Sequence, residues 1–247
     1  MSFGTEYQRI VGMPKLTYSE KSHECESIFG FFSRLCIIGD ITNEVIPYSK
    51  VESAEIPYYV SHLTLRNYLE MQACILTGAY HSAARSLRWL FEMNVIGATA
   101  CVKPVLLDYH LNATRGIDLS EFEKFLERCD TGKIRISKGK YKTIFDQFKL
   151  PSEDLLSLYS DLCKYVHPSS ISFDKGLTWP NLQYVPEKFD EIFLLATKTL
   201  DLVFWMQSKM CLCFDGGIVQ ALRYFLKDDD GLNQYLPMTV SLLSSLK

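Results

Sequence analysis

Residues 81–92 read HSAARSLRWLFE, a stretch in which four polar side chains share one side of a predicted helix. At about 100° per residue, positions 81, 85, 88 and 92 fall within roughly 60° of one another. The side chains between and after them are mostly large and apolar, which is typical of a buried helix. We therefore predict an all-α fold in which this helix is central. Its polar row, His81, Arg85, Arg88 and Glu92, would face a cleft, polar groups of another helix or a subunit interface, with an ordinary solvated helix face as the alternative.

Four segments carry the apolar spacing of long helices: 57–78, 80–103, 152–167 and 186–210. Pro57 and Pro186 stand where a helix favours proline as its first residue. Only a residue or two near Gly78 separates the first two segments, so they should form an antiparallel helical hairpin. These four helices are predicted to form the centre of the fold.

The chain on either side of this centre also reads as helical. A helix is predicted over 16–38 after an irregular lead-in, with Gly39 as its stop and a long connection over 40–56. Helices between 215 and 247, the first capped by Asp215, would pack on the core bundle of about 57–210. Because no repeat or linker divides the chain, we predict that 1–247 is a single-domain multi-helix bundle.

The composition excludes several broad classes of protein. The 247 residues are 47% hydrophobic and 22% charged, as in an ordinary soluble globule, and the net charge of -3 gives no overall attraction to nucleic acid or anionic lipid. The first residues lack the pattern of a secretory signal. The longest apolar run, 192–206, falls short of the ~20 residues that span a bilayer. We predict a cytoplasmic protein without a membrane partner.

The eight cysteines fit buried core thiols in such a compartment. Disulfides stay open as an alternative if the source is a hyperthermophile. Cys211 and Cys213 form the one close pair, and they lack the second pair or nearby histidine that a zinc site needs. The chain also lacks a Gly-rich phosphate loop, a Gly-x-Ser-x-Gly elbow and the paired Glu-x-x-His motifs of di-metal bundles. We expect no metal and no cofactor.

A cluster of five cations interrupts the otherwise balanced charge pattern. Isoleucine and tyrosine alternate with these cations, which are Lys133, Arg135, Lys138, Lys140 and Lys142. The alternation and the Ser-Lys-Gly sequence allow a small β-hairpin near 133–142, with a solvated loop as the alternative. Such a patch would contribute at most weak, salt-dependent RNA binding.

The helix over 152–167 ends in Tyr159-Ser-Asp-Leu-Cys-Lys164-Tyr-Val-His167-Pro. Together with Arg88-x-x-x-Glu92, this pattern resembles helical proteins of the broad HEPN-like group, over about residues 57–210. The resemblance implies a helical bundle, often dimeric, with Arg88, Glu92 and His167 as its polar centre. Ribonuclease members of the group carry an arginine followed, after four to six residues, by histidine on one helix. No arginine of this chain has a histidine at that distance.

Two hypotheses for function follow from these residues. In an enzyme, His167 would act as general acid or base, Arg85 and Arg88 would hold a phosphate-like anion, and Glu92 would orient them. His81, Tyr159 and Lys164 would complete the ligand contacts. In a binding or interaction module, the same groups would form a buried network that fixes helix register. We favour this second hypothesis because it needs no substrate, and the apolar helix surfaces further predict a homodimer.

Overall fold

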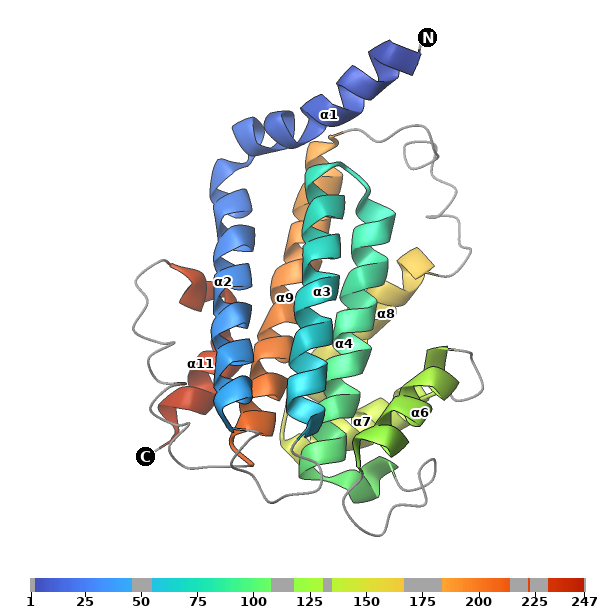
Figure 1. The fold of residues 1–247 in the computed structure, drawn as a ribbon, viewed down its shortest axis with the longest axis vertical. Coiled ribbons are helices and arrows are strands. Elements are labelled where there is room, and N and C mark those ends of the chain that lie inside the picture. The colour runs from blue at the N-terminus through green and yellow to red at the C-terminus, as the bar shows by residue number, and fades with distance from the viewer. Residues whose placement is uncertain are drawn as a thin grey trace.

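All regular structure in the described part of the chain is helical, which confirms the predicted all-α bundle (Figure 1). The computed structural model describes residues 3–45, 55–107, 118–130, 135–166, 184–213, 222 and 231–246. The α-helices are α1 (Phe3–Glu20), α2 (Ser22–Val45), α3 (Glu55–Leu76), α4 (Tyr80–Val102), α6 (Leu119–Asp130), α7 (Lys138–Phe148), α8 (Ser152–Val166), α9 (Pro186–Cys211) and α11 (Pro237–Ser244). Two short 3-10 helices, η2 (Pro104–Leu107) and η4 (Leu232–Tyr235), accompany them.

The long helices α2, α3, α4 and α9 lie side by side with nearly parallel axes (Figure 1). Helix α4 contacts α3, α9 and α8, and 15 of its 23 residues are buried. The prediction that the helix carrying residues 81–92 is central is therefore confirmed. One hydrophobic core extends through these helices and into α7 and α11.

The predicted hairpin of α3 and α4 is also confirmed, and glycine explains both its turn and its close packing. Gly78 adopts a positive φ of 75°, and the N–H of Ala79 donates to the Cys74 carbonyl over 2.8 Å. This left-handed conformation ends α3 at little cost in a residue without a Cβ. Farther along α4, a Cβ on Gly97 would lie 2.7 Å from a methyl group of Val60. Glycine at this position thus lets the two helices approach closely.

The N-terminal prediction was wrong in its boundaries. Helix α1 covers most of the expected irregular lead-in with Pro14 inside it, and α2 continues beyond Gly39 to Val45. Contacts with α3 explain both differences. The Thr17 hydroxyl donates to the Leu76 carbonyl over 3.0 Å, which fixes α1 at the end of α3. Gly39 faces Leu65 at close range, so it serves helix packing rather than a helix stop.

The β-hairpin considered near 133–142 is contradicted by helix α7, which begins at Lys138. The Ser137 hydroxyl accepts a hydrogen bond from the Lys140 N–H over 3.2 Å and so caps the helix. Tyr141 and Phe145, one turn apart, are both buried. This spacing is helical, and it outweighs the short alternation that precedes it.

The C-terminal helix α11 packs against α9 and is held there by a buried carboxylate. Asp201 of α9 accepts hydrogen bonds from the N–H groups of Met238 and Thr239, each over 2.9 Å, and another from the Thr239 hydroxyl. Asp201 therefore caps α11 from a different helix. The predicted helix from Asp215 falls on residues outside the described part, Leu222 excepted. Among the described helices, none is both long and apolar enough to cross a bilayer.

Candidate functional site

Two residues of the predicted polar row, Arg88 and Glu92, meet Tyr159 where α4 crosses α8. Arg88 Nε donates to Glu92 Oε1 over 3.1 Å, and the Tyr159 hydroxyl donates to the same oxygen over 3.0 Å. The Arg88 guanidinium lies 5.6 Å from the centre of the Tyr159 ring, which suits a cation–π contact. We refer to these three residues as the Arg88 cluster. It joins two helices that are far apart in sequence.

The surroundings of the Arg88 cluster keep its hydrogen bonds in place. The Tyr159 ring packs 5.4 Å from the ring of Phe91 and 4.9 Å from the ring of Tyr141. Burial, reinforced by the Glu92 carboxylate, raises the pKa of Tyr159 far above its usual value, so its hydroxyl stays a proton donor. Burial would lower the pKa of Arg88, but Glu92 and Tyr159 outweigh this effect and raise it. The arginine therefore remains charged and paired.

Of the other residues predicted for this site, the structure describes His81, Arg85 and Lys164, and each is placed differently from this cluster. His81 Nδ1 lies 3.2 Å from the carbonyl oxygen of Tyr165, and the two rings pack edge to face. Arg85 is exposed to solvent. Lys164 is exposed too and pairs with Asp161 over 2.6 Å. His167, the proposed acid or base, lies outside the described residues.

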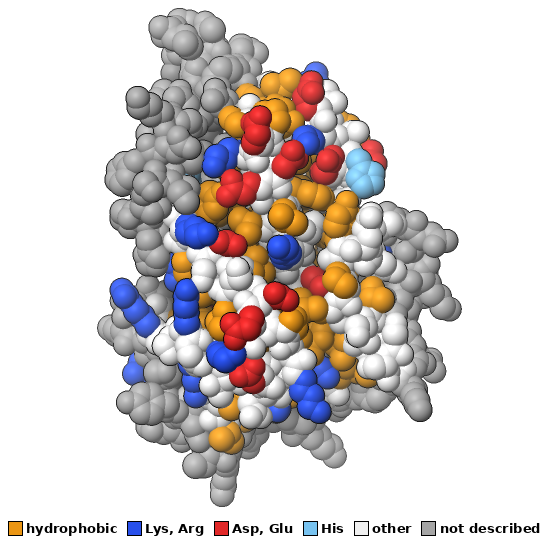
Figure 2. Space-filling view, turned by 180° about the vertical axis from the view of Figure 1, so that it is seen from behind, with side chains coloured by type: hydrophobic (Ala, Val, Ile, Leu, Met, Phe, Trp, Pro, Cys, Tyr) orange, Lys and Arg blue, Asp and Glu red, His pale blue; other side chains and the backbone are white. Residues whose placement is uncertain are grey.

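Two of the cations predicted to bind RNA, Lys138 and Lys142, contact an acid or a hydrogen-bond acceptor. Lys142 pairs with Glu153, and Lys138 donates to the Ser160 hydroxyl, each over 2.5 Å. Arg135 is exposed and Lys140 half-buried, while Lys133 lies outside the described residues. Acidic and basic side chains are interspersed over the described part of the face seen in Figure 2. Such a mixed surface favours weak binding of nucleic acid at most.

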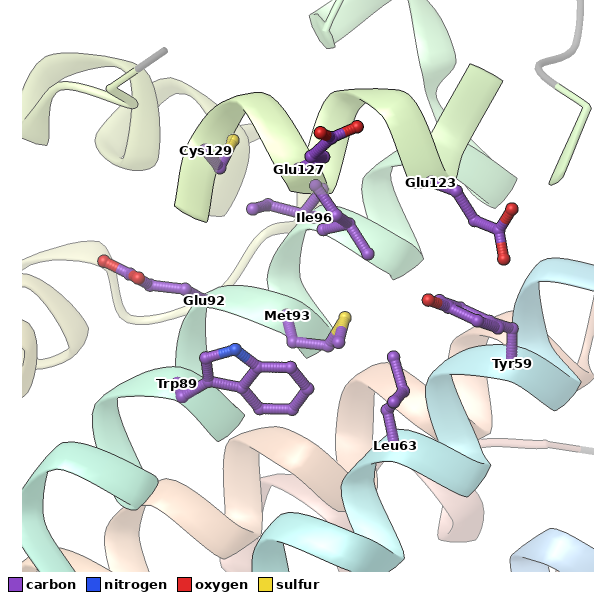
Figure 3. A pocket seen from close by; sticks show the side chains of 10 residues that line it. Tyr59, Leu63, Trp89, Glu92, Met93, Ile96, Glu123, Glu127 and Cys129 are labelled. Carbon is purple, nitrogen blue, oxygen red and sulfur yellow. The ribbon is translucent and has the colours of Figure 1, made fainter. Parts of the chain in front are cut away.

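A pocket of about 280 Å³ opens beside the Arg88 cluster, between α3, α4 and α6 (Figure 3). Its walls combine apolar and aromatic side chains with carboxylates. The lining residues are Tyr59, Leu63, Trp89, Glu92, Met93, Ile96, Glu123, Leu126, Glu127 and Cys129. A concave, mostly apolar site with a few polar groups is the usual form of a small-molecule site.

Glu92 links the pocket to the Arg88 cluster. Figure 3 shows its carboxylate directed away from the Trp89 ring and Met93, which agrees with its hydrogen bond to Tyr159 on α8. Glu123 extends from α6 toward the end of the pocket where Tyr59 lies (Figure 3). The residues around this pocket therefore include carboxylates and aromatic rings, but none of the predicted anion-binding cations.

Sequence reasoning missed most of this pocket. Trp89 and Met93 stand one turn apart beside Glu92, so a second face of the central helix carried a signal. The sequence gives no sign that Glu123 and Glu127 line a pocket, because their helix has the pattern of an ordinary amphipathic helix. The sequence pattern of one helix does not show which other helix packs against it.

Among the described residues, no group of three or more His, Cys, Asp or Glu side chains is placed to hold a metal ion. Comparison with known proteins found no matching family model, no similar curated protein and no similar solved structure.

Proposed function

We propose that this protein is a binding module whose ligand site is the pocket between α3, α4 and α6. The main support for this proposal is that the polar groups fall into two separate sets, the Arg88 cluster and the lining of the pocket. Arg88 Nε is engaged by Glu92, whereas the pocket next to it is lined by aromatic rings and carboxylates. The Arg88 cluster then acts as a support that holds α4 against α8 behind the pocket wall.

The alternative is a HEPN-like nuclease or other phosphate-ester-processing enzyme that uses His167 with Arg85 and Arg88. Such an enzyme would need arginine donors directed at a phosphate. The pairing of Arg88 with Glu92 and the separate, exposed position of Arg85 support the binding module instead. Carboxylates at the pocket would also repel a phosphate.

The pocket chemistry favours a small organic cation with an apolar body. Trp89 and Tyr59 offer aromatic surfaces to a cation, and Glu123 adds negative charge. Glu92 contributes less to this charge because Arg88 pairs with it. A volume near 280 Å³ lies just below the usual range of small-molecule sites, about 300–1,000 Å³, and so suits a small ligand.

The test compares phenethylammonium with the similarly sized anion phenylpropionate by ligand-observed NMR. The amine should bind with a dissociation constant of about a millimolar, as expected for a fragment, and the anion should bind at least about ten-fold more weakly. Leu63→Trp, which fills the pocket, should abolish binding. The control Leu69→Trp lies on the exposed side of the same helix and should leave binding unchanged. Equal binding of amine and anion, or binding that survives Leu63→Trp, would contradict the proposal.

We also propose that the module acts as a homodimer in the cytoplasm. All eight cysteines are free thiols, which suits a reducing compartment. The N-terminal end of helix α1 extends away from the bundle (Figure 1). It exposes 55% of Val11, 44% of Leu16 and 42% of Tyr18. Large apolar side chains exposed together on one helix are typical of a protein-binding surface.

Light scattering at micromolar concentration should give about twice the 28.4 kDa chain mass. Leu16→Glu places a charge in the proposed interface and should shift the mass toward one chain. Leu194→Glu, at a position of α9 that is 53% exposed, is the matched control and should leave the dimer intact. A monomeric wild-type protein would refute the dimer.

A further inference from the structure

Three of the eight free thiols gather at one end of the bundle. Cys101 lies in the last turn of α4, Cys211 is the last residue of α9, and Cys213 follows two residues later. Cys211 is buried, and Cys213 is exposed to solvent. None of these thiols belongs to the pocket or to the Arg88 cluster.

The register of α4 and α9 brings these cysteines together. Gln207 Nε2 donates to Asn94 Oδ1 over 3.1 Å, and a Cβ on Gly97 would lie 3.4 Å from the Met210 sulfur. The two residues of each pair are 113 positions apart in the sequence. Helices α4 and α9 therefore run in the same direction and keep one register over this stretch. Both helices end at the lower end of the bundle in Figure 1. One turn beyond Gly97, the same offset brings Cys101 opposite the end of α9, beside Cys213.

The electrostatic effects agree with this placement. Burial raises the pKa of Cys101 well above its usual value, and the neighbouring Cys213 and Cys211 raise it further. Burial raises the pKa of Cys211 to about 12, with Cys213 again as a neighbour. Burial also raises the pKa of Cys213, although the positive charge of Lys209 offsets part of this rise. Cys213 is therefore the thiol of the three that solvent reaches and that a cation helps to ionise.

We propose that Cys213 and Cys101 form an oxidisable dithiol that reacts with low-molecular-weight disulfides such as glutathione disulfide. In the first step, the Cys213 thiolate attacks one sulfur of glutathione disulfide. A bond forms between Cys213 and glutathione, and one glutathione thiolate leaves and takes up the proton that Cys213 lost. In the second step, Cys101 loses its proton and attacks Cys213 Sγ, and the second glutathione leaves as its thiol. Two protein thiols are oxidised to one disulfide while one glutathione disulfide is reduced to two glutathiones.

The bridge would fasten the end of α9 to α4. It would close a loop of more than 100 residues in the unfolded chain, and the constraint on so long a loop stabilises the folded state. We expect the oxidised protein to unfold about 5–15 °C higher than the reduced protein. The state of the dithiol would therefore control how firmly α4 and α9 stay together at this end of the bundle.

The experiment treats the full-length protein with glutathione disulfide, blocks the remaining thiols, and maps the cysteines by mass spectrometry. A Cys101–Cys213 peptide should appear, with the loss of two hydrogen atoms from the intact protein. Cys101→Ser should instead retain glutathione on Cys213, and Cys213→Ser, an exposed substitution, should form no bridge. Cys36→Ser on α2 is the matched control and should be oxidised like the wild type.

Two results would overturn the proposal. One is a wild-type protein that keeps glutathione on Cys213 while Cys101 stays reduced. The other is a bridge that forms equally well in Cys213→Ser. Because both readouts follow the thiols directly, they are independent of whether the pocket binds an organic cation.

Discussion

We expect the protein to lose stability steeply above about pH 10, because buried tyrosines must remain protonated in the folded state. Five tyrosines are buried, and burial is the largest cause that raises the pKa of each, to about 12 for Tyr80. The five are Tyr68, Tyr80, Tyr141, Tyr159 and Tyr165. Their unfolded pKa lies near 10.0. The stabilisation is therefore complete below that pH and is lost as pH rises through the folded pKa values.

The size of this effect follows from proton linkage. Each tyrosine that ionises only in the unfolded state removes about 1 kcal/mol of stability between pH 10 and 11, so five remove roughly 5 kcal/mol. This loss is comparable with the whole stability of many domains, which is about 5–15 kcal/mol. Circular dichroism and tyrosinate absorbance followed together should show one steep transition.

Single substitutions separate this effect from ordinary alkaline damage. Tyr141→Phe keeps the ring packed against Phe91 and Phe145 but removes the titrating hydroxyl, so the loss of stability with pH should become shallower. Tyr58→Phe, at a position that is 44% exposed, should leave the pH dependence unchanged. If all tyrosines ionised near their usual pKa while the helical signal persisted, the described burial would be wrong.

Asp201→Ala should lower the free energy of unfolding by about 2–4 kcal/mol. The substitution leaves the N–H groups of Met238 and Thr239 without their carboxylate acceptor. Thr239 is almost fully buried, so its N–H has little access to water as a substitute. Helix α11 should also detach first, which hydrogen exchange would report as lost protection over residues 237–244.

The matched control for this prediction is Asp161→Ala. Asp161 forms an exposed pair with Lys164 within one helix, and such pairs contribute about 0.5 kcal/mol or less. Urea unfolding of the two variants should therefore give clearly different midpoints. An Asp201→Ala protein with wild-type stability and protection would show that Asp201 does not hold α11.

The central helices were predictable because their signals are local and agree with one another. The apolar spacing of 80–103, Gly78 before it and Pro186 at the start of α9 all coincide with observed helix ends. The errors arose where a distant contact overrides a local signal. Pro14 lies inside α1, and Thr17, three residues later, anchors that helix on α3.

The candidate site was predictable only in part, for the same reason. The need of Arg88 and Glu92 for partners on an apolar helix predicted a polar cluster with the 152–167 helix, and Tyr159 of that helix donates to Glu92. The role assigned to His167 stays a prediction, since that residue lies outside the described part of the chain. The pocket depends on which helix covers Trp89, and no residue within α4 specifies that α6 does so.

The claim that Arg88 supports the fold rather than a phosphate site is tested most directly by urea unfolding of Arg88→Ala. Glu92 would keep its bond from Tyr159 but lose its cation, and the Arg88 and Glu92 side chains are only 20% and 30% exposed. We expect the free energy of unfolding to fall by about 1.5–3 kcal/mol, less than for a fully buried pair. Arg85→Ala, at an exposed position of the same helix, should change it by less than about 0.5 kcal/mol. An Arg88→Ala protein as stable as Arg85→Ala would contradict the structural role of Arg88 and would support the alternative that Arg88 binds an anion.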